Sequence, residues 1–339
     1  MVYSEDYKKL VDATALKDKY YEIDERVEEI CKEAFKGCDK LEEIVMPKKL
    51  KKIDSEAFQG CSSLTKLTLP DSVMSIGKGA FRGCSGLTEL TLPNSVARID
   101  GLAFCGCSGL TELTLPNSVK SIGDGAFADC SGLEKITVES GNSRYDSRDN
   151  CNSIIDKKTN TLIVGCKNSI IPNSVARIGD GAFADCSGLT ELTLPNSVAS
   201  IGDGAFRGCS GLTELTLPNS VTSIGERAFE GCTGLTELTL PNSVKSIGDG
   251  AFAYCSGMTE LTLPNSVTSI GDGAFGDCSG LSKITSLAEI PPVCGSGVFD
   301  RVNKTNCELI VPVLSVIAYK QAEVWNEFSN IRGFVGEKK

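Results

Sequence analysis

The sequence predicts a β-dominated solenoid of the α/β class, wound into about eleven coils of 23 residues with one parallel sheet along one side. The phrase Leu-Thr-Glu-Leu-Thr-Leu-Pro-Asn-Ser-Val recurs, and Ile-Gly, Ala-Phe and Cys follow it. Within that phrase, apolar and polar residues alternate as in a strand with one buried face. The phenylalanines of the Ala-Phe pairs are spaced by 23 residues, apart from one step of 56. They are Phe35, Phe58, Phe81, Phe104, Phe127, Phe183, Phe206, Phe229, Phe252 and Phe275.

The amino-acid composition counts against several classes of function. The apolar fraction of 41% is enough for a continuous core. A net charge of −10 repels nucleic acid and anionic lipid, and no segment reaches the roughly 18 to 20 apolar residues of a membrane span. The chain has no histidine, which removes the commonest general base and every histidine-containing metal site. These features count against catalytic residues, a metal site, a cofactor, a nucleic-acid partner and a membrane span, and we expect a monomer.

The coil of residues 108–130 illustrates the expected path. Leu113 and Leu115 alternate with Glu112 and Thr114, the period-two pattern of a half-buried strand. A proline then ends the strand, because it lacks an amide hydrogen.

The second half of that coil returns to the next strand. Gly123 and Gly125 offer the permissive backbone of a tight corner, and Phe127 fills the coil interior. The return is too short for a full α-helix, so a short strand and a 3₁₀ turn are expected.

Sixteen cysteines form one main pattern. Ten stand three residues after a repeat phenylalanine, and we expect a buried column of thiols, each donating weakly to the backbone of the next coil. These are Cys38, Cys61, Cys84, Cys107, Cys130, Cys186, Cys209, Cys232, Cys255 and Cys278. Metal binding is disfavoured, because a 23-residue interval supplies no paired C-x₂-C spacing. A disulfide between Cys151 and Cys166 stays open for an oxidising compartment.

The array has irregular parts as well as repeats. Residues 137–172 are an insert in which 153–155 and 161–164 predict a hairpin projecting from the body. Residues 1–19 are expected to form a tail or a capping helix before the solenoid of residues 20–285.

Residues 286–339 form the expected C-terminal capping region. Within it, 315–328 predict a helix with Ser315 as its N-cap. The residues at helical spacing are Val316, Tyr319, Ala322, Trp325 and Phe328. We read this helix as the lid on the last coil, with a partner-binding helix as the alternative.

The outward positions of the strands are the candidate partner-binding residues. A solvated face without a partner is the alternative, and carboxylates one strand apart make a poor calcium cage. The outward residues hardly vary between coils. Either the array expanded recently and this face is not yet specialised, or the ligand is itself periodic, such as a polysaccharide or a filament. The more variable positions after the repeat Val and Phe are a second candidate. The predicted residues are Glu89, Thr91, Glu112, Thr114, Glu191, Thr193, Glu214, Thr216, Glu237, Thr239, Glu260 and Thr262.

The pattern L-x-x-L-x-L-P-x-S-V-x-x-I-G-x-x-A-F-x-x-C, complete in residues 212–232, resembles the BspA-like branch of the leucine-rich repeat proteins. The resemblance covers about residues 20–335, with the insert and the C-terminal ending included. It implies a right-handed solenoid that binds a protein or glycan at the cell surface, without catalysis. Residues 1–19 contain no apolar signal segment, so a cytoplasmic interaction scaffold is the alternative.

Overall fold

The computed structural model describes residues 1–335. The chain divides into two compact units, Met1–Ser169 and Ile170–Lys339, and each is described by itself.

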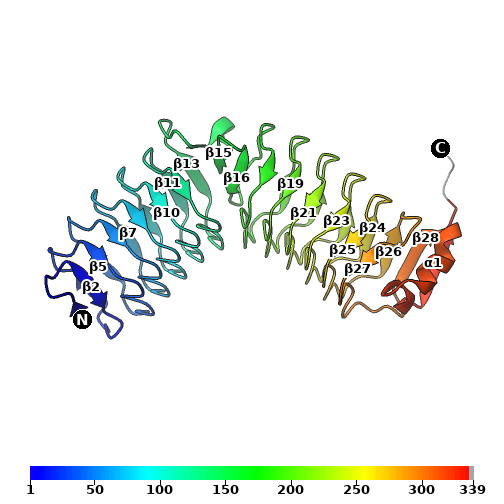
Figure 1. Ribbon diagram of the computed structural model, residues 1–339, viewed down its shortest axis with the longest axis horizontal. Coiled ribbons are helices and arrows are strands. Elements are labelled where there is room, and N and C mark those ends of the chain that lie inside the picture. The colour runs from blue at the N-terminus through cyan, green and yellow to red at the C-terminus, as the bar shows by residue number, and fades with distance from the viewer. Residues whose placement is uncertain (336–339) are drawn as a thin grey trace. The chain divides into compact units, whose positions relative to one another are not determined.

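The unit Met1–Ser169 is built from short strands and one 3₁₀ turn (Figure 1). Its elements are β1 (Val2–Tyr3), β2 (Lys9–Asp12), β3 (Tyr20–Glu22), β4 (Glu29–Ile30), β5 (Glu43–Val45), β6 (Lys52–Ile53), β7 (Lys66–Thr68), β8 (Ser75–Ile76), β9 (Glu89–Thr91), β10 (Arg98–Ile99), β11 (Glu112–Leu115), β12 (Ser121–Ile122), β13 (Lys135–Val138), β14 (Tyr145–Asp146), η1 (Arg148–Asn150), β15 (Ile154–Asp156) and β16 (Thr161–Val164).

The unit Ile170–Lys339 repeats the plan and adds a short helix near its end. Its elements are β17 (Arg177–Ile178), β18 (Glu191–Thr193), β19 (Ser200–Ile201), β20 (Glu214–Thr216), β21 (Ser223–Ile224), β22 (Glu237–Thr239), β23 (Ser246–Ile247), β24 (Glu260–Leu263), β25 (Ser269–Ile270), β26 (Lys283–Ser286), β27 (Val293–Cys294), β28 (Glu308–Pro312), η2 (Val313–Ser315), α1 (Val316–Gln321), η3 (Trp325–Glu327) and β29 (Asn330–Phe334).

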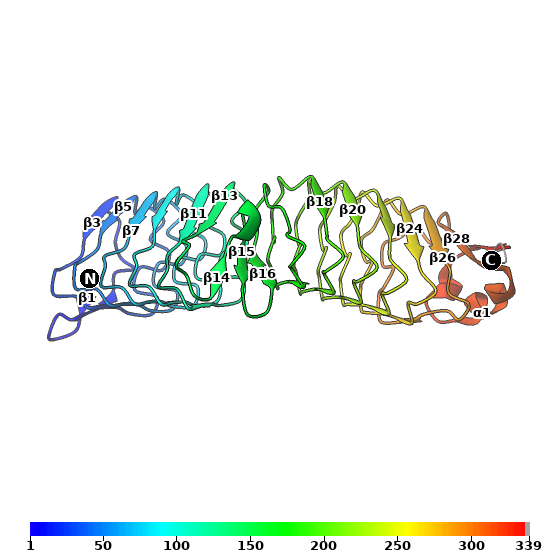
Figure 2. The same cartoon turned by 90° about the horizontal axis from the view of Figure 1, so that it is seen from above.

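Each coil contributes two strands, which confirms the predicted solenoid. The Leu-Thr-Leu segments form one row, and strands β3, β5, β7, β11 and β13 lie in sequence along one side of the first unit (Figure 2). The Ser-Ile segments on the return form a second row of parallel strands, with Arg98 opposite Ser75 and Ser121. The single parallel sheet expected from the sequence therefore has a companion on the return side, because the return backbone also pairs coil to coil.

The repeat phenylalanines form continuous internal columns in both units. Phe206 is fully buried, and its ring stacks at 5.1 Å on Phe183 and at 5.1 Å on Phe229. In the first unit the column runs from Phe35 to Phe127 with centroid distances of 4.8 to 5.3 Å. The buried column of rings that the 23-residue spacing predicts is confirmed.

The ten repeat cysteines are buried beside the phenylalanines, as expected. The thiol of Cys61 donates to the carbonyl of Phe35 at 3.1 Å, and that of Cys209 donates to Phe183 at 3.1 Å. The acceptor belongs to the preceding coil, so the expected donation to the next coil is wrong. The phenylalanine carbonyl of the preceding coil is the acceptor within reach of the thiol, at 3.1 to 3.3 Å in both units.

The corner before each cysteine is held by a third set of hydrogen bonds between coils. Alternate amides donate to the next coil, for example Gly204 to Glu226 at 2.8 Å and Phe206 to Ala228 at 2.7 Å. The two corner glycines of a coil are required for different reasons. Gly125 has a positive φ of 62°, whereas Gly123 is required for close packing, because a Cβ there would lie 2.3 Å from the Gly101 amide nitrogen.

The N-terminal segment is a hairpin rather than the expected tail or helix. Strand β1 pairs antiparallel with β2, and β2 joins the return row by pairing with β4. The alternation in β2 buries Leu10 completely while its other residues are exposed. A strand that extends the row also covers the first coil, which removes the need for a helix.

The insert forms the predicted hairpin, with Ile154 opposite Val164. All three residues of β15 are buried, so the hairpin packs into the body instead of projecting from it. Apolar side chains on both faces of this strand account for the difference. Cys151 and Cys166 are buried thiols and not a disulfide.

The C-terminal lid is present but less helical than predicted. Helix α1 has six residues, and Ala322 after it is extended. Ser315 is the N-cap residue, yet its hydroxyl donates to the Glu289 carbonyl at 2.7 Å instead of capping the helix. Trp325 and Phe328 contact the Phe299 ring edge-on at 5.4 and 5.3 Å.

Candidate functional site

The predicted strand-face residues of the second unit lie in register on neighbouring strands. Glu191 of β18 lies opposite Glu214 of β20, and Glu237 of β22 lies opposite Glu260 of β24. All four glutamates are exposed, and we call them the acidic strip. Beside them Thr193, Thr216, Thr239 and Thr262 form a second column, of which only Thr262 is half-buried. The leucines between the two columns point into the core, which fixes this orientation.

The acidic strip is only partly neutralised. Lys283 pairs with Glu260 at 2.9 Å, at the C-terminal end of the strip. Glu191, Glu214 and Glu237 have no ion pair with any of residues 1–335. Neighbouring parallel strands are about 4.8 Å apart, so these carboxylates repel one another at short range. Such a surface favours a ligand that brings positive charge.

The corresponding face of the first unit has a different charge pattern. Glu89 pairs with Lys66 at 3.0 Å, and Glu112 pairs with Lys135 at 3.3 Å. Thr91 and Thr114 lie exposed beside them, on β9 and β11. Of the predicted site residues, those of the first unit are therefore neutralised within their own face, and those of the second unit carry most of the free charge.

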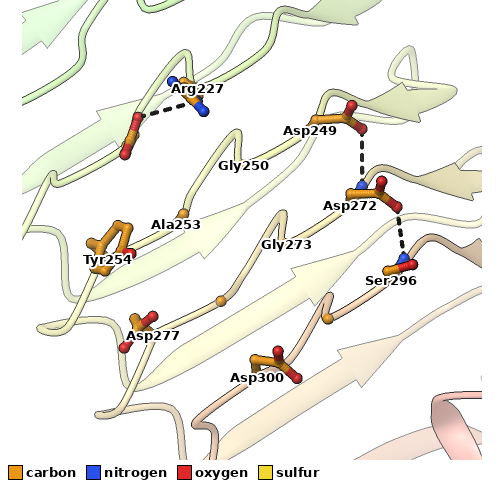
Figure 3. A pocket seen from close by; sticks show the side chains of 13 residues that line it. Arg227, Asp249, Gly250, Ala253, Tyr254, Asp272, Gly273, Asp277, Ser296 and Asp300 are labelled. Carbon is orange, nitrogen blue, oxygen red and sulfur yellow. Dashed lines mark hydrogen bonds and ion pairs between the residues drawn. The ribbon is translucent and has the colours of Figure 1, made fainter.

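A groove of about 540 Å³ crosses the corners of the second unit, on the flank that follows each phenylalanine (Figure 3). The sequence makes this flank the second candidate for binding, because its residues vary more between coils than those of the strand face. The groove is lined by Arg227, Glu230, Asp249, Gly250, Ala253, Tyr254, Asp272, Gly273, Gly276, Asp277, Ser296, Gly297 and Asp300.

Three of the four aspartates that line this corner groove have partners within the second unit. Asp249 accepts a hydrogen bond from the Asp272 amide at 2.9 Å, and Asp272 accepts one from the Ser296 amide at 2.7 Å (Figure 3). Asp277 is paired with Arg301 at 3.0 Å. Because these carboxylates have partners within the unit, the groove is a weaker candidate than the strip.

Residues 1–335 offer neither a metal-ligand cluster nor a membrane-spanning helix. Among these residues, no cluster of three or more histidine, cysteine, aspartate or glutamate side chains could hold a metal ion. The same range contains no helix with the length and apolar character required to cross a membrane.

The model of the BspA-type leucine-rich repeat region, with six copies, matches residues 28–155 and 152–282. A leucine-rich cell surface protein from Faecalibacterium prausnitzii is 32% identical, with a TM-score of 0.71 and 83% of each chain covered. The pneumococcal vaccine antigen PcpA is 26% identical, with a TM-score of 0.76, and the match covers 95% of this chain and 80% of that one.

A leucine-rich repeat protein from Eubacterium ventriosum shares the fold at 22% identity, with a TM-score of 0.58 over 88% of this chain and 69% of its own. No curated protein sequence matches the chain. The repeat fold of bacterial surface proteins suggests a protein-binding role. The match to the family model extends over more than half of the residues, and the chain belongs to the BspA-type leucine-rich repeat family.

Proposed function

We propose that the protein is a non-enzymatic binding module of the bacterial cell surface, and that it presents the strand face of its coils to a protein or glycan partner. Support for the location comes from the similar protein of Faecalibacterium prausnitzii, which is described as a cell surface protein. Support for the face comes from its exposed, in-register polar side chains.

The acidic strip is the observation that carries the proposal. Three of its glutamates have no ion pair with any of residues 1–335, while Glu89 and Glu112 of the first unit are paired with lysines. A ligand with cationic groups relieves the repulsion between neighbouring carboxylates when it binds. The threonine hydroxyls beside the strip supply hydrogen-bond donors and acceptors for the uncharged parts of such a ligand.

The regular spacing of the face favours a periodic ligand. Identical residues recur on neighbouring strands, about 4.8 Å apart. A polysaccharide or a filament meets such a surface with the same contacts at each step, and many weak contacts then add up to a useful affinity.

An intracellular interaction scaffold is the second candidate, and the cysteines favour it. All sixteen lie within the described residues as thiols and not as disulfides. Thiols persist in reducing compartments, whereas disulfides are typical of secreted proteins. The same strand face serves as the binding surface in this case.

A binding screen with charge variants tests the proposal. The full chain is screened against glycans and extracellular-matrix proteins, and then the variant E191Q/E214Q/E237Q/E260Q is screened. We expect its hits to bind at least tenfold more weakly, with a smaller dependence on salt concentration.

A matched control separates the strip from net charge. The variant E25Q/E226Q/E289Q/E323Q removes the same number of exposed glutamates outside the strip. Equal loss of binding in both variants indicates a non-specific charge effect. Unchanged binding by the strip variant eliminates the acidic strip as the site.

A further inference from the structure

No strand among residues 1–335 pairs with the outer edge of β13 in the first unit. On its inner edge β13 pairs with β11, where the amides of Lys135 and Glu139 donate to Thr111 and Leu115. Backbone groups of a parallel strand point alternately to its two neighbours. Ile136 and Val138 therefore direct their amides and carbonyls away from β11, towards the open edge.

The side chain of Asn152 covers half of this edge. Its carbonyl oxygen accepts a hydrogen bond from the Ile136 amide at 2.6 Å, and its amide nitrogen donates to the Glu134 carbonyl at 2.7 Å. One side chain thus makes the two bonds that a residue of a neighbouring strand would make. Asn152 has a positive φ of 56°, a backbone conformation that asparagine tolerates better than most residues.

The other half of the edge is unsatisfied. The Val138 amide and the Ile136 carbonyl have no hydrogen-bond partner among residues 1–335. Both residues are buried as whole residues, and both line a groove beside this edge. One donor and one acceptor side by side are the pairing groups that an added strand uses.

A groove of about 530 Å³ runs along this edge, and all the residues that line it belong to the first unit. Ser147, Asn150 and Asn168 line it together with residues of β13. The side-chain amide of Asn150 has no partner within residues 1–335. The lining contains no aromatic ring, so it offers no platform on which a sugar could stack.

We propose that this edge groove binds an extended peptide segment of a partner protein, which adds a strand to β13 by pairing with the Val138 amide and the Ile136 carbonyl. Recognition by strand addition takes its affinity from main-chain hydrogen bonds. The segment is uncharged where it crosses the groove, because the nearby charges are already paired: Lys167 with Glu134 at 2.6 Å and Lys135 with Glu112 at 3.3 Å. The inference rests on the proposed function only in that the partner is a protein, and it does not involve the acidic strip.

Displayed random peptides are the probe, panned against the full chain. V138P removes the open amide and breaks no hydrogen bond within the fold, while V138A keeps the amide and trims the side chain. We expect selected peptides to bind V138P about tenfold more weakly than V138A, the effect of one lost hydrogen bond. Hydrogen exchange of the Val138 amide should slow when peptide is bound.

A second pair of variants blocks the groove without touching the backbone. T137W places a large ring over the groove, and T114W places the same ring at the paired position one coil earlier. We expect T137W to abolish peptide binding and T114W to leave it unchanged. Equal loss in T114W assigns the peptides to the general strand face and overturns the inference.

The remaining outcomes also decide the question. Peptides that bind V138P and V138A equally overturn the strand-addition geometry. A chain that selects no peptide but binds glycans overturns the inference while the proposed function stands. If the parent chain binds peptides in the groove and the strip variant keeps all its ligands, the inference is supported and the acidic strip is eliminated as a binding site.

Discussion

The Cys61 thiol donates a hydrogen bond to the Phe35 carbonyl across 3.1 Å, from one coil to the coil before it. The same carbonyl accepts the Cys38 amide at 3.1 Å, so each column position joins a turn within its coil to the following coil. The thiol is thus a structural donor in a place too small for most other polar side chains. It performs this task only while it carries its proton.

Alkaline pH should therefore destabilise the fold. Burial raises the pKa of Cys84 and of Cys232 to about 12, from an ordinary value of 9.0. Below pH 9 the thiols are protonated in both the folded and the unfolded chain, and this stability is fully present. Between pH 9 and 12 only the unfolded chain loses the protons, so the free energy of unfolding falls as pH rises.

Urea unfolding in reductant at about pH 8, 9.5 and 10.5 measures this loss. Each buried thiol contributes a slope of up to about 1.4 kcal/mol per pH unit. The variant C84A/C232A should have a shallower slope than the parent chain. A free energy of unfolding that stays constant across this range contradicts the role given to the thiols.

Phe206→Ala should lower the free energy of unfolding by about 3–5 kcal/mol. The ring is fully buried between Phe183 and Phe229, so its removal leaves a cavity that the stacked neighbours cannot fill. Phe206→Leu keeps most of the volume and should cost less than half as much. Chemical denaturation followed by circular dichroism gives both values, and similar small losses for the two variants would argue against the column as a main stabiliser.

Tyr254→Gly should raise the free energy of unfolding by about 1 kcal/mol. Tyr254 has a positive φ of 60° at a corner where the preceding coils carry Gly208 and Gly231. Its side chain is 53% exposed, so its removal loses little packing. Tyr254→Ala is the control, because it removes the ring and keeps the Cβ that the left-handed backbone disfavours. A gain of stability in Tyr254→Ala equal to that in Tyr254→Gly would assign the effect to the ring.

The 23-residue repeat predicted those parts of the fold in which equivalent residues of every coil have the same environment. Phe206 and Cys209 have equivalents 23 residues away, so one physical reason, burial against the next coil, applies to the whole column. Which neighbouring coil accepts the hydrogen bond of each thiol could not be predicted. It depends on how far the corner that carries the cysteine is shifted along the solenoid axis.

The irregular parts resisted prediction because their partners lie far away in the sequence or have no pattern. Leu10 sits alone among exposed residues of β2, a signal too short to identify a strand. The C-terminal helix ends early: Ala322 fits the helical spacing but has an extended backbone, and Val324 two residues later has a positive φ of 67°.

Exposure of the strand-face residues followed from alternation, but their charge balance and the two grooves did not. Whether Glu112 is paired depends on the lysine that the next coil supplies. The edge groove depends on Asn152, whose side chain replaces a strand only because the insert folds back against β13. A sequence pattern shows neither that Glu112 lies close to this lysine nor that Asn152 lies close to β13.

The C-terminal lid should loosen before the solenoid when its buried hydrogen bonds are removed. The Tyr319 hydroxyl lies 2.6 Å from the Ser286 hydroxyl and donates to the Ala288 carbonyl at 3.0 Å, in a fully buried position. Tyr319→Phe leaves these partners unsatisfied and should cost the lid about 1–3 kcal/mol. Coils of a solenoid contact only their neighbours, so the loss should stay local.

The single tryptophan makes this measurable. Trp325 is fully buried in the lid, where it contacts Tyr319 edge-on at 5.3 Å and donates to the Pro292 carbonyl at 2.9 Å. In Tyr319→Phe the urea transition followed by Trp325 fluorescence should move to lower concentration, while the transition followed by circular dichroism moves less. Phe206→Ala is the matched comparison, because its defect lies far from the lid along the sequence. If both probes shift equally in Tyr319→Phe, the lid unfolds with the coils as one cooperative body and the local account is wrong.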